Sequence, residues 1–112
     1  LGGIDARQRD DCLPAPEAQR WLGKNVPHWR RRLQGEAGYA EPARLPVVCM
    51  ASSERPFADT ERHRLHVRGW NSQEVRIALA HEYLHLAFEG HPRAQDESGI
   101  ERLARQLIME TY

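Results

Sequence analysis

Residues 81–85 read HEYLH and match the pattern His-Glu-x-x-His, which can build a metal site on a single helix. Residues four positions apart lie on the same helix face, with about 6 Å between their Cβ atoms. The imidazoles of His81 and His85 can therefore converge on one Zn²⁺ at about 2.0–2.1 Å. Glu82 stands beside them and can take a proton from a water molecule at the metal. The segment predicts a zinc site with Glu82 as general base.

A catalytic zinc needs a third protein ligand, and the downstream candidates are His91, Glu97 and Glu101. His91 follows His81 by ten residues, the spacing of the third histidine in metzincins. Those proteins carry a glycine where the chain leaves the helix, and Phe88 occupies that position here. We expect the helix to continue past Phe88. His91 would then lie off the ligand face and cap the helix end, where a protonated imidazole is favoured.

The segment 96–101, DESGIE, resembles the second motif of the gluzincins, Asn-Glu-x-x-Ser-Asp. The resemblance implies that Glu97 is the third zinc ligand. It also implies that Glu101 hydrogen-bonds a ligating histidine and orients it. On a helical wheel Glu97 lies nearer the interior than Glu101 does. We therefore predict Glu97 as the third ligand, with Glu101 and His91 as alternatives.

Two helices are expected to carry these residues. The first spans 72–89, with Asn71 as its N-cap, Glu74 in a capping-box position and Gly90 as its stop. The second spans 96–109 and has apolar side chains along one face.

The N-terminal part predicts two further helices and a poorly specified lead-in over 1–14. Apolar residues recur at helical spacing after residue 16, but Pro27 interrupts them. Proline lacks a backbone N–H and breaks helix interiors. We therefore expect two short helices, 16–23 and 26–36.

Two apolar segments predict a small sheet. Residues 45–51 form a valine-rich run typical of a buried strand, and 63–69 alternate as a half-buried strand does. Residues 52–61 are polar and predict a loop. We expect the strand at 63–69 to border the cleft, where a peptide could bind by strand addition.

The two cysteines, Cys12 and Cys49, could form one disulfide, or they could remain free thiols that pack as small apolar groups. A disulfide is the favoured reading. It would pin the N-terminal lead-in to the first strand and would place the protein in an oxidising compartment, either the periplasm or the cell exterior.

Composition limits the function classes. The 112 residues suffice for one domain over 1–112, and the 16 basic and 16 acidic residues cancel, which argues against a nucleic-acid partner. No run approaches the ~20 apolar residues of a membrane span. The chain begins at Leu1, so we expect a domain cut from a longer protein or a mature form.

The block from Leu79 to Met109, LAHEYLHLAFEGHPRAQDESGIERLARQLIM, resembles a minimal zincin core. It also resembles an uncharacterised family of bacterial secreted proteins that is known only as a domain of unknown function. The resemblance implies an exported bacterial protein with a zincin-like α+β fold: N-terminal helices, a small sheet, the HEYLH helix and a C-terminal helix.

The function predicted from these residues is zinc-dependent hydrolysis, in the first place of a peptide bond in a peptide or protein substrate. His81, His85 and Glu97 would bind Zn²⁺. Glu82 would carry the proton from water to the leaving amine. Two alternatives stay open: a non-catalytic zincin-like module that binds a peptide or partner, and a metal-dependent amidase that acts on a cell-wall substrate.

Overall fold

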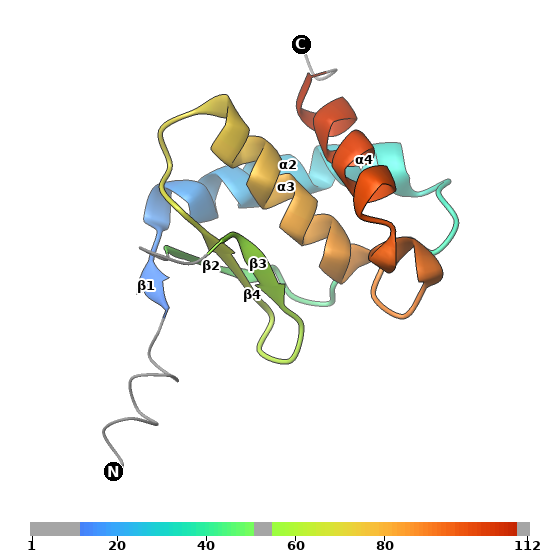
Figure 1. Ribbon diagram of the computed structural model, residues 1–112, viewed down its shortest axis with the longest axis horizontal. Coiled ribbons are helices and arrows are strands. Elements are labelled where there is room, and N and C mark those ends of the chain that lie inside the picture. Colours follow the sequence, from blue (N-terminus) through green and yellow to red (C-terminus); the bar gives the residue numbers. More distant parts are fainter. Residues whose placement is uncertain (1–11, 51–54, 110–112) are drawn as a thin grey trace.

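The computed structural model describes residues 12–50 and 55–109. Within them the chain has an α+β fold, as predicted, with helices beside a small mixed sheet (Figure 1). The elements in chain order are β1 Leu13–Pro14, α2 Pro16–Leu33, β2 Val47–Met50, β3 Phe57–Asp59, β4 Arg64–Val67, α3 Gln73–Ala87, the 3₁₀-helix η1 Pro92–Gln95 and α4 Glu97–Met109.

The sheet has the order β1-β2-β4-β3. β2 and β4 are parallel, and Val48 stands opposite Leu65. β1 and β3 pair antiparallel with β2 and β4 respectively. β4 therefore has partners on both sides, and the prediction that strand 63–69 borders the cleft was wrong. The edge strand beside β4 is β3, which lies in the predicted loop 52–61, and β1 is the opposite edge. Residues 52–54 of that predicted loop lie outside the described residues.

α2 and α3 pack on the sheet, and α4 lies beyond α3, away from the strands (Figure 1). α3 packs on β3 and β4, α2 packs on β2, and α4 packs along α3. The core between these layers includes Val48, Leu65 and Val67 from the sheet and Trp29 from α2, none more than 1% exposed. Burial of this apolar area supplies the main free energy that holds α3 in place.

α2 is one helix, although two were predicted. It runs through Pro27 without a break. The buried residues of α2 keep helical spacing across the proline: Ala18, Leu22, Val26, Trp29 and Leu33. An interior proline costs roughly 3 kcal/mol, and full burial of one large apolar side chain returns about 1.5–3 kcal/mol. Burial of this continuous stripe therefore outweighs the proline.

A disulfide joins Cys12 and Cys49, as predicted, with their Cα atoms 4.8 Å apart. It lies next to β1, whose Pro14 stands opposite Cys49 in the sheet. Of the predicted lead-in 1–14, residues 1–11 lie outside the described residues. Residues 12–14 are held to the sheet by both the disulfide and the β1–β2 pairing.

α3 begins one residue later than predicted. Its N-cap is Ser72, whose hydroxyl accepts a hydrogen bond from Val75 N–H at 3.3 Å; it is not Asn71. α3 ends at Ala87 with Phe88 as its C-cap, so the prediction that the helix continues past Phe88 to residue 89 was wrong. The chain turns at Gly90, whose φ of +88° suits glycine. None of the helices in the described residues is long and apolar enough to cross a membrane.

Candidate metal centre

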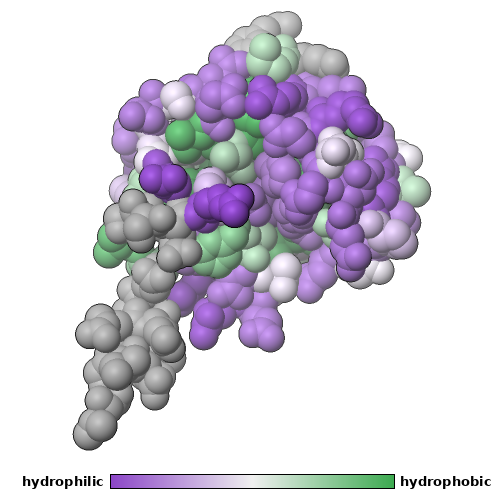
Figure 2. Space-filling view, viewed as in Figure 1, coloured by the Kyte–Doolittle hydropathy of each residue, from purple (hydrophilic) through white to green (hydrophobic). Residues whose placement is uncertain are grey.

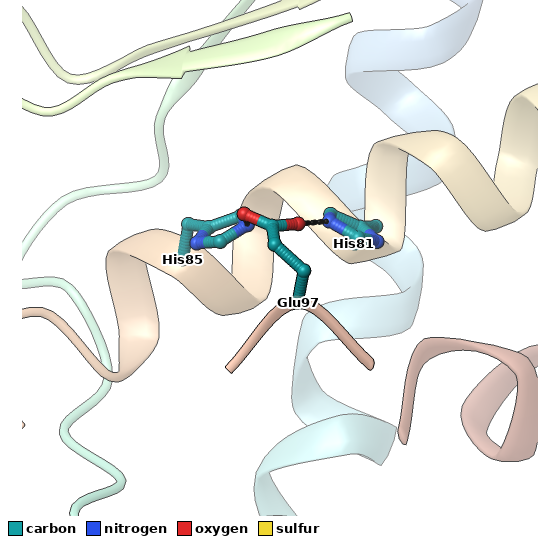
Figure 3. A group of neighbouring side chains, drawn as sticks. All are labelled: His81, His85 and Glu97. Atoms are coloured by element: carbon teal, nitrogen blue, oxygen red, sulfur yellow. Dashed lines mark hydrogen bonds and ion pairs between the residues drawn. The ribbon is translucent and has the colours of Figure 1, made fainter. Parts of the chain in front are cut away.

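The face of α3 that meets α4 carries His81 and His85, one helical turn apart, with ring centroids separated by 5.0 Å. Glu97, the first residue of α4, extends its carboxylate between them (Figure 3). Its Oε1 lies 2.9 Å from Nε2 of His81, and its Oε2 lies 3.2 Å from Nε2 of His85. The three predicted ligands therefore meet at one point.

This cluster lies at the surface. One ligand atom each from His81, His85 and Glu97 falls within 4.8 Å of the others. The side chains of His81 and His85 are 14% and 18% exposed, and that of Glu97 is 69% exposed. Figure 2 shows mostly hydrophilic side chains over the side of the molecule where α4 and η1 lie. An ion or substrate can thus approach from solvent.

Glu101 contacts the other nitrogen of His81. Its Oε1 lies 2.7 Å from Nδ1 of His81, so the ring is held between Glu101 and Glu97. Burial opposes ionisation of both carboxylates, but their contacts with His81 give each a lowered pKa. Ionised carboxylates only accept hydrogen bonds, so both ring nitrogens of His81 act as donors in this arrangement.

The same contacts act on His81 itself. Burial disfavours its charged form, but the hydrogen bonds to Glu101 and Glu97 outweigh burial and raise the pKa of His81. Glu101 thus makes the hydrogen bond to His81 that its resemblance to the gluzincin motif implied. With Nδ1–H held by Glu101, a cation beside Glu97 would have to take the place of the Nε2 proton.

Glu82 is half-buried and lines a different hollow of the surface from Glu97. It lines a cleft of about 670 Å³ together with His85, and Ala58 of β3 and Ala94 of η1 form part of the walls. Burial raises the pKa of Glu82, against the attraction of the neighbouring histidines. A carboxyl group with a raised pKa next to a cleft is a candidate general base.

His91 lies apart from the metal-ligand cluster. Its Nδ1 accepts a hydrogen bond from Arg93 N–H at 3.2 Å, so His91 caps the start of η1. The prediction that His91 caps the end of α3 was wrong. Its ring packs against Gly38. His91 lines the cleft but makes no part of the His81, His85 and Glu97 group.

Two features of the site were not predicted. One is β3, whose three residues are too few to show an alternating pattern. The other is Arg105, whose Nε donates to Oε2 of Glu101 at 2.8 Å. Glu101 and Arg105 are four residues apart on one helix, and this spacing could have indicated the contact between them.

Comparison with known proteins gives a family and a cellular location. Residues 1–93 match the family described as Predicted secreted protein (DUF2300). The match covers the HEYLH segment and ends before Glu97. The family description and the Cys12–Cys49 disulfide confirm the predicted secreted or periplasmic location.

A curated relative is the uncharacterised protein YfaQ of Escherichia coli (strain K12), 46% identical over 102 residues. The aligned region covers 91% of this chain and 18% of the relative, so the chain corresponds to less than a fifth of that protein. No solved structure matches the chain, and the fold is established as α+β without a closer class. By its match over residues 1–93, the chain belongs to the DUF2300 family of predicted secreted proteins.

Proposed function

We propose that this domain binds one Zn²⁺ through His81, His85 and Glu97 and hydrolyses a peptide bond in the adjacent cleft. The observation that carries the proposal is the position of the Glu97 carboxylate, which lies within 3.2 Å of Nε2 of both histidines. Two imidazoles and one carboxylate are a donor set that suits catalytic zinc, which takes three protein ligands and leaves one position open.

The chemistry divides between the ion and Glu82. Zinc in such sites polarises a carbonyl group and lowers the pKa of water toward ~7. Glu82 lines the cleft beside His85 and has a raised pKa caused by burial. It would accept the proton of the attacking water and pass it to the leaving nitrogen. A purely structural zinc site would have no need for a buried carboxyl group at this point.

The edge strand favours an extended peptide as substrate. β3 pairs with β4 on one side only, and its Ala58 and the following Thr60 line the cleft. The free edge of a strand can bind an extended peptide through main-chain hydrogen bonds. A peptide bound along β3 would pass beside Glu82. The zincin-like core is proposed on the same grounds: a helix that carries HEYLH beside the edge strand of a small sheet.

The first experiment measures zinc by elemental analysis in protein purified without added metal. We expect close to one zinc per chain in the wild type and none in His81→Ala or His85→Ala. Full zinc content in either variant would overturn the assignment of the site.

The second experiment tests catalysis with a library of fluorogenic peptides and with cell-wall peptides that contain amide cross-links. We expect Glu82→Gln to keep its zinc and lose hydrolysis, because glutamine preserves the shape but cannot accept the proton. Hydrolysis of only the cell-wall amides would favour an amidase. A zinc-loaded wild type that binds peptides without cleaving them would favour the non-catalytic module.

A further inference from the structure

We infer that Arg105 is a positioning residue for the proposed zinc site: it holds Glu101 so that Glu101 fixes the ring of His81. The inference rests on the proposed function. Among the described residues, Glu101 alone contacts both Arg105 and His81. One carboxylate oxygen of Glu101 contacts His81 and the other accepts a hydrogen bond from Arg105.

The geometry assigns every polar atom of this link. Oε1 of Glu101 faces Nδ1 of His81 at 2.7 Å, and Oε2 faces Nε of Arg105 at 2.8 Å. The other end of the Arg105 guanidinium reaches Glu74, with N–O distances of 3.0 and 3.4 Å. The planar guanidinium therefore joins two carboxylates, one from the first turn of α3 and one from α4.

This link matters because Glu101 is not held by burial. Its side chain is 39% exposed, and a carboxylate in that position can rotate freely into water. Arg105 occupies the Oε2 side, which leaves Oε1 directed at His81. Arg105 also bonds to Glu74 on α3, the helix that carries His81, and so joins α3 to α4.

The consequence for His81 is a fixed ring. Oε1 of Glu101 accepts the Nδ1 proton of His81 at 2.7 Å, and Nε2 then faces Glu97 at 2.9 Å, on the side where the proposed metal would bind in place of the Nε2 proton. Without Arg105, we expect Glu101 to hold the ring less firmly and zinc affinity to fall with it.

The experiment compares Arg105→Ala with Arg102→Ala. Arg102 is the matched control because it is an exposed arginine on α4 and makes no ion pair within the described part of the chain. Zinc affinity is measured by competition with a chelator. We expect Arg105→Ala to weaken zinc binding about tenfold, the lower end of the effect of residues that orient metal ligands. Arg102→Ala should change zinc affinity by less than about twofold.

Two further measurements separate positioning from folding. Arg105→Lys should recover part of the affinity, because lysine supplies a charge but cannot join both carboxylates as a fork. In zinc-free protein, ¹⁵N spectra of the imidazole should show a slowly exchanging proton on Nδ1 of His81 in the wild type, because Glu101 holds that proton. The same proton should exchange faster in Arg105→Ala. Thermal unfolding should hardly change, because exposed ion pairs contribute little to stability.

The outcomes distinguish this inference from the proposed function. A wild type that binds no zinc overturns the proposed function, and the exchange rate of the Nδ1 proton of His81 then decides the role of Arg105 by itself. Equal zinc affinity in Arg105→Ala and Arg102→Ala, with the His81 proton unchanged, overturns the role of Arg105 and leaves the zinc site standing.

Discussion

Oε1 of Glu97 lies 2.9 Å from Nε2 of His81, although the two residues are 16 positions apart and belong to different helices. The contact exists because η1 turns the chain back directly after α3, so that α4 starts beside the ring. Acidic residues are common in a first helical turn, where the helix dipole favours them. The resemblance of residues 96–101 to the gluzincin motif and the contact with His81 are what single out Glu97.

Glu97→Ala should therefore weaken zinc binding far more than the 10–100-fold that is typical of residues behind the ligands. The control is His91→Ala, which should leave zinc affinity unchanged because His91 caps η1 instead. Zinc affinity of each purified variant is measured by chelator competition. Loss of the metal in His91→Ala or Glu101→Ala, but not in Glu97→Ala, would show that Glu97 is not the third ligand.

Gly38→Ala should destabilise the protein. Gly38 has a φ of +89°, and an added Cβ would lie 2.4 Å from Cγ of His91. Both the backbone strain and the displaced ring cost free energy, of order 1–3 kcal/mol for such strain alone. Urea unfolding is the measurement. Gly35→Ala is the control, because no atom lies within 4 Å of its added Cβ. Equal stability of the two variants would contradict the prediction.

Reduction of the disulfide should lower the melting temperature. The bond between Cys12 and Cys49 closes a loop with a sequence separation of 37, which corresponds to about 4 kcal/mol in the loop-entropy model. Thiol titration of unfolded protein should find no free thiol before reduction and two afterwards. The double variant Cys12→Ser/Cys49→Ser should melt like the reduced protein. Two free thiols in protein recovered from an oxidising compartment would contradict the prediction.

The pair of Arg30 and Glu41 should make stability depend on pH in the acid range. Hydrogen bonds from Arg30 lower the pKa of Glu41 in the folded protein. A lowered folded pKa means that the pair stabilises the fold above the ordinary carboxyl pKa and that this stability is lost as pH falls through the lowered value. Near pH 7 the melting temperature of the wild type should thus be higher than that of Glu41→Gln. The difference between the two melting temperatures should vanish in acid.

Melting curves at several pH values test this prediction. Glu61→Gln is the control, because Glu61 is exposed and makes no ion pair within residues 55–109. A difference between the wild type and Glu41→Gln that stays constant down to strongly acidic pH would contradict the assignment.

The HEYLH helix could be predicted because its signals are local. Helical spacing places His81 and His85 on one face whatever the rest of the chain does, and a glycine marks the end. Glu97 could be predicted only through a resemblance. Its position depends on the turn at η1, which a sequence pattern does not reveal.

The errors share a physical cause, which is packing between elements. Pro27 predicts a break, but Trp29 beyond it is fully buried against Tyr83, which lies far outside any local window, and the helix stays continuous. β3 has only three residues, too few for a strand pattern. It pairs with β4, and its Phe57 stacks on His66 of that strand with ring centroids 4.2 Å apart.

All three proposed ligands come from consecutive helices, α3 and α4, with 16 positions between the first and the last. Contacts over short separations form with a small loss of loop entropy and therefore early in folding. The pairing of β1 with β2, by contrast, brings together Leu13 and Met50, which are 37 positions apart, and must wait for a longer segment to close. We expect the helical hairpin to assemble first, so that the proposed zinc site would be formed before the sheet is complete.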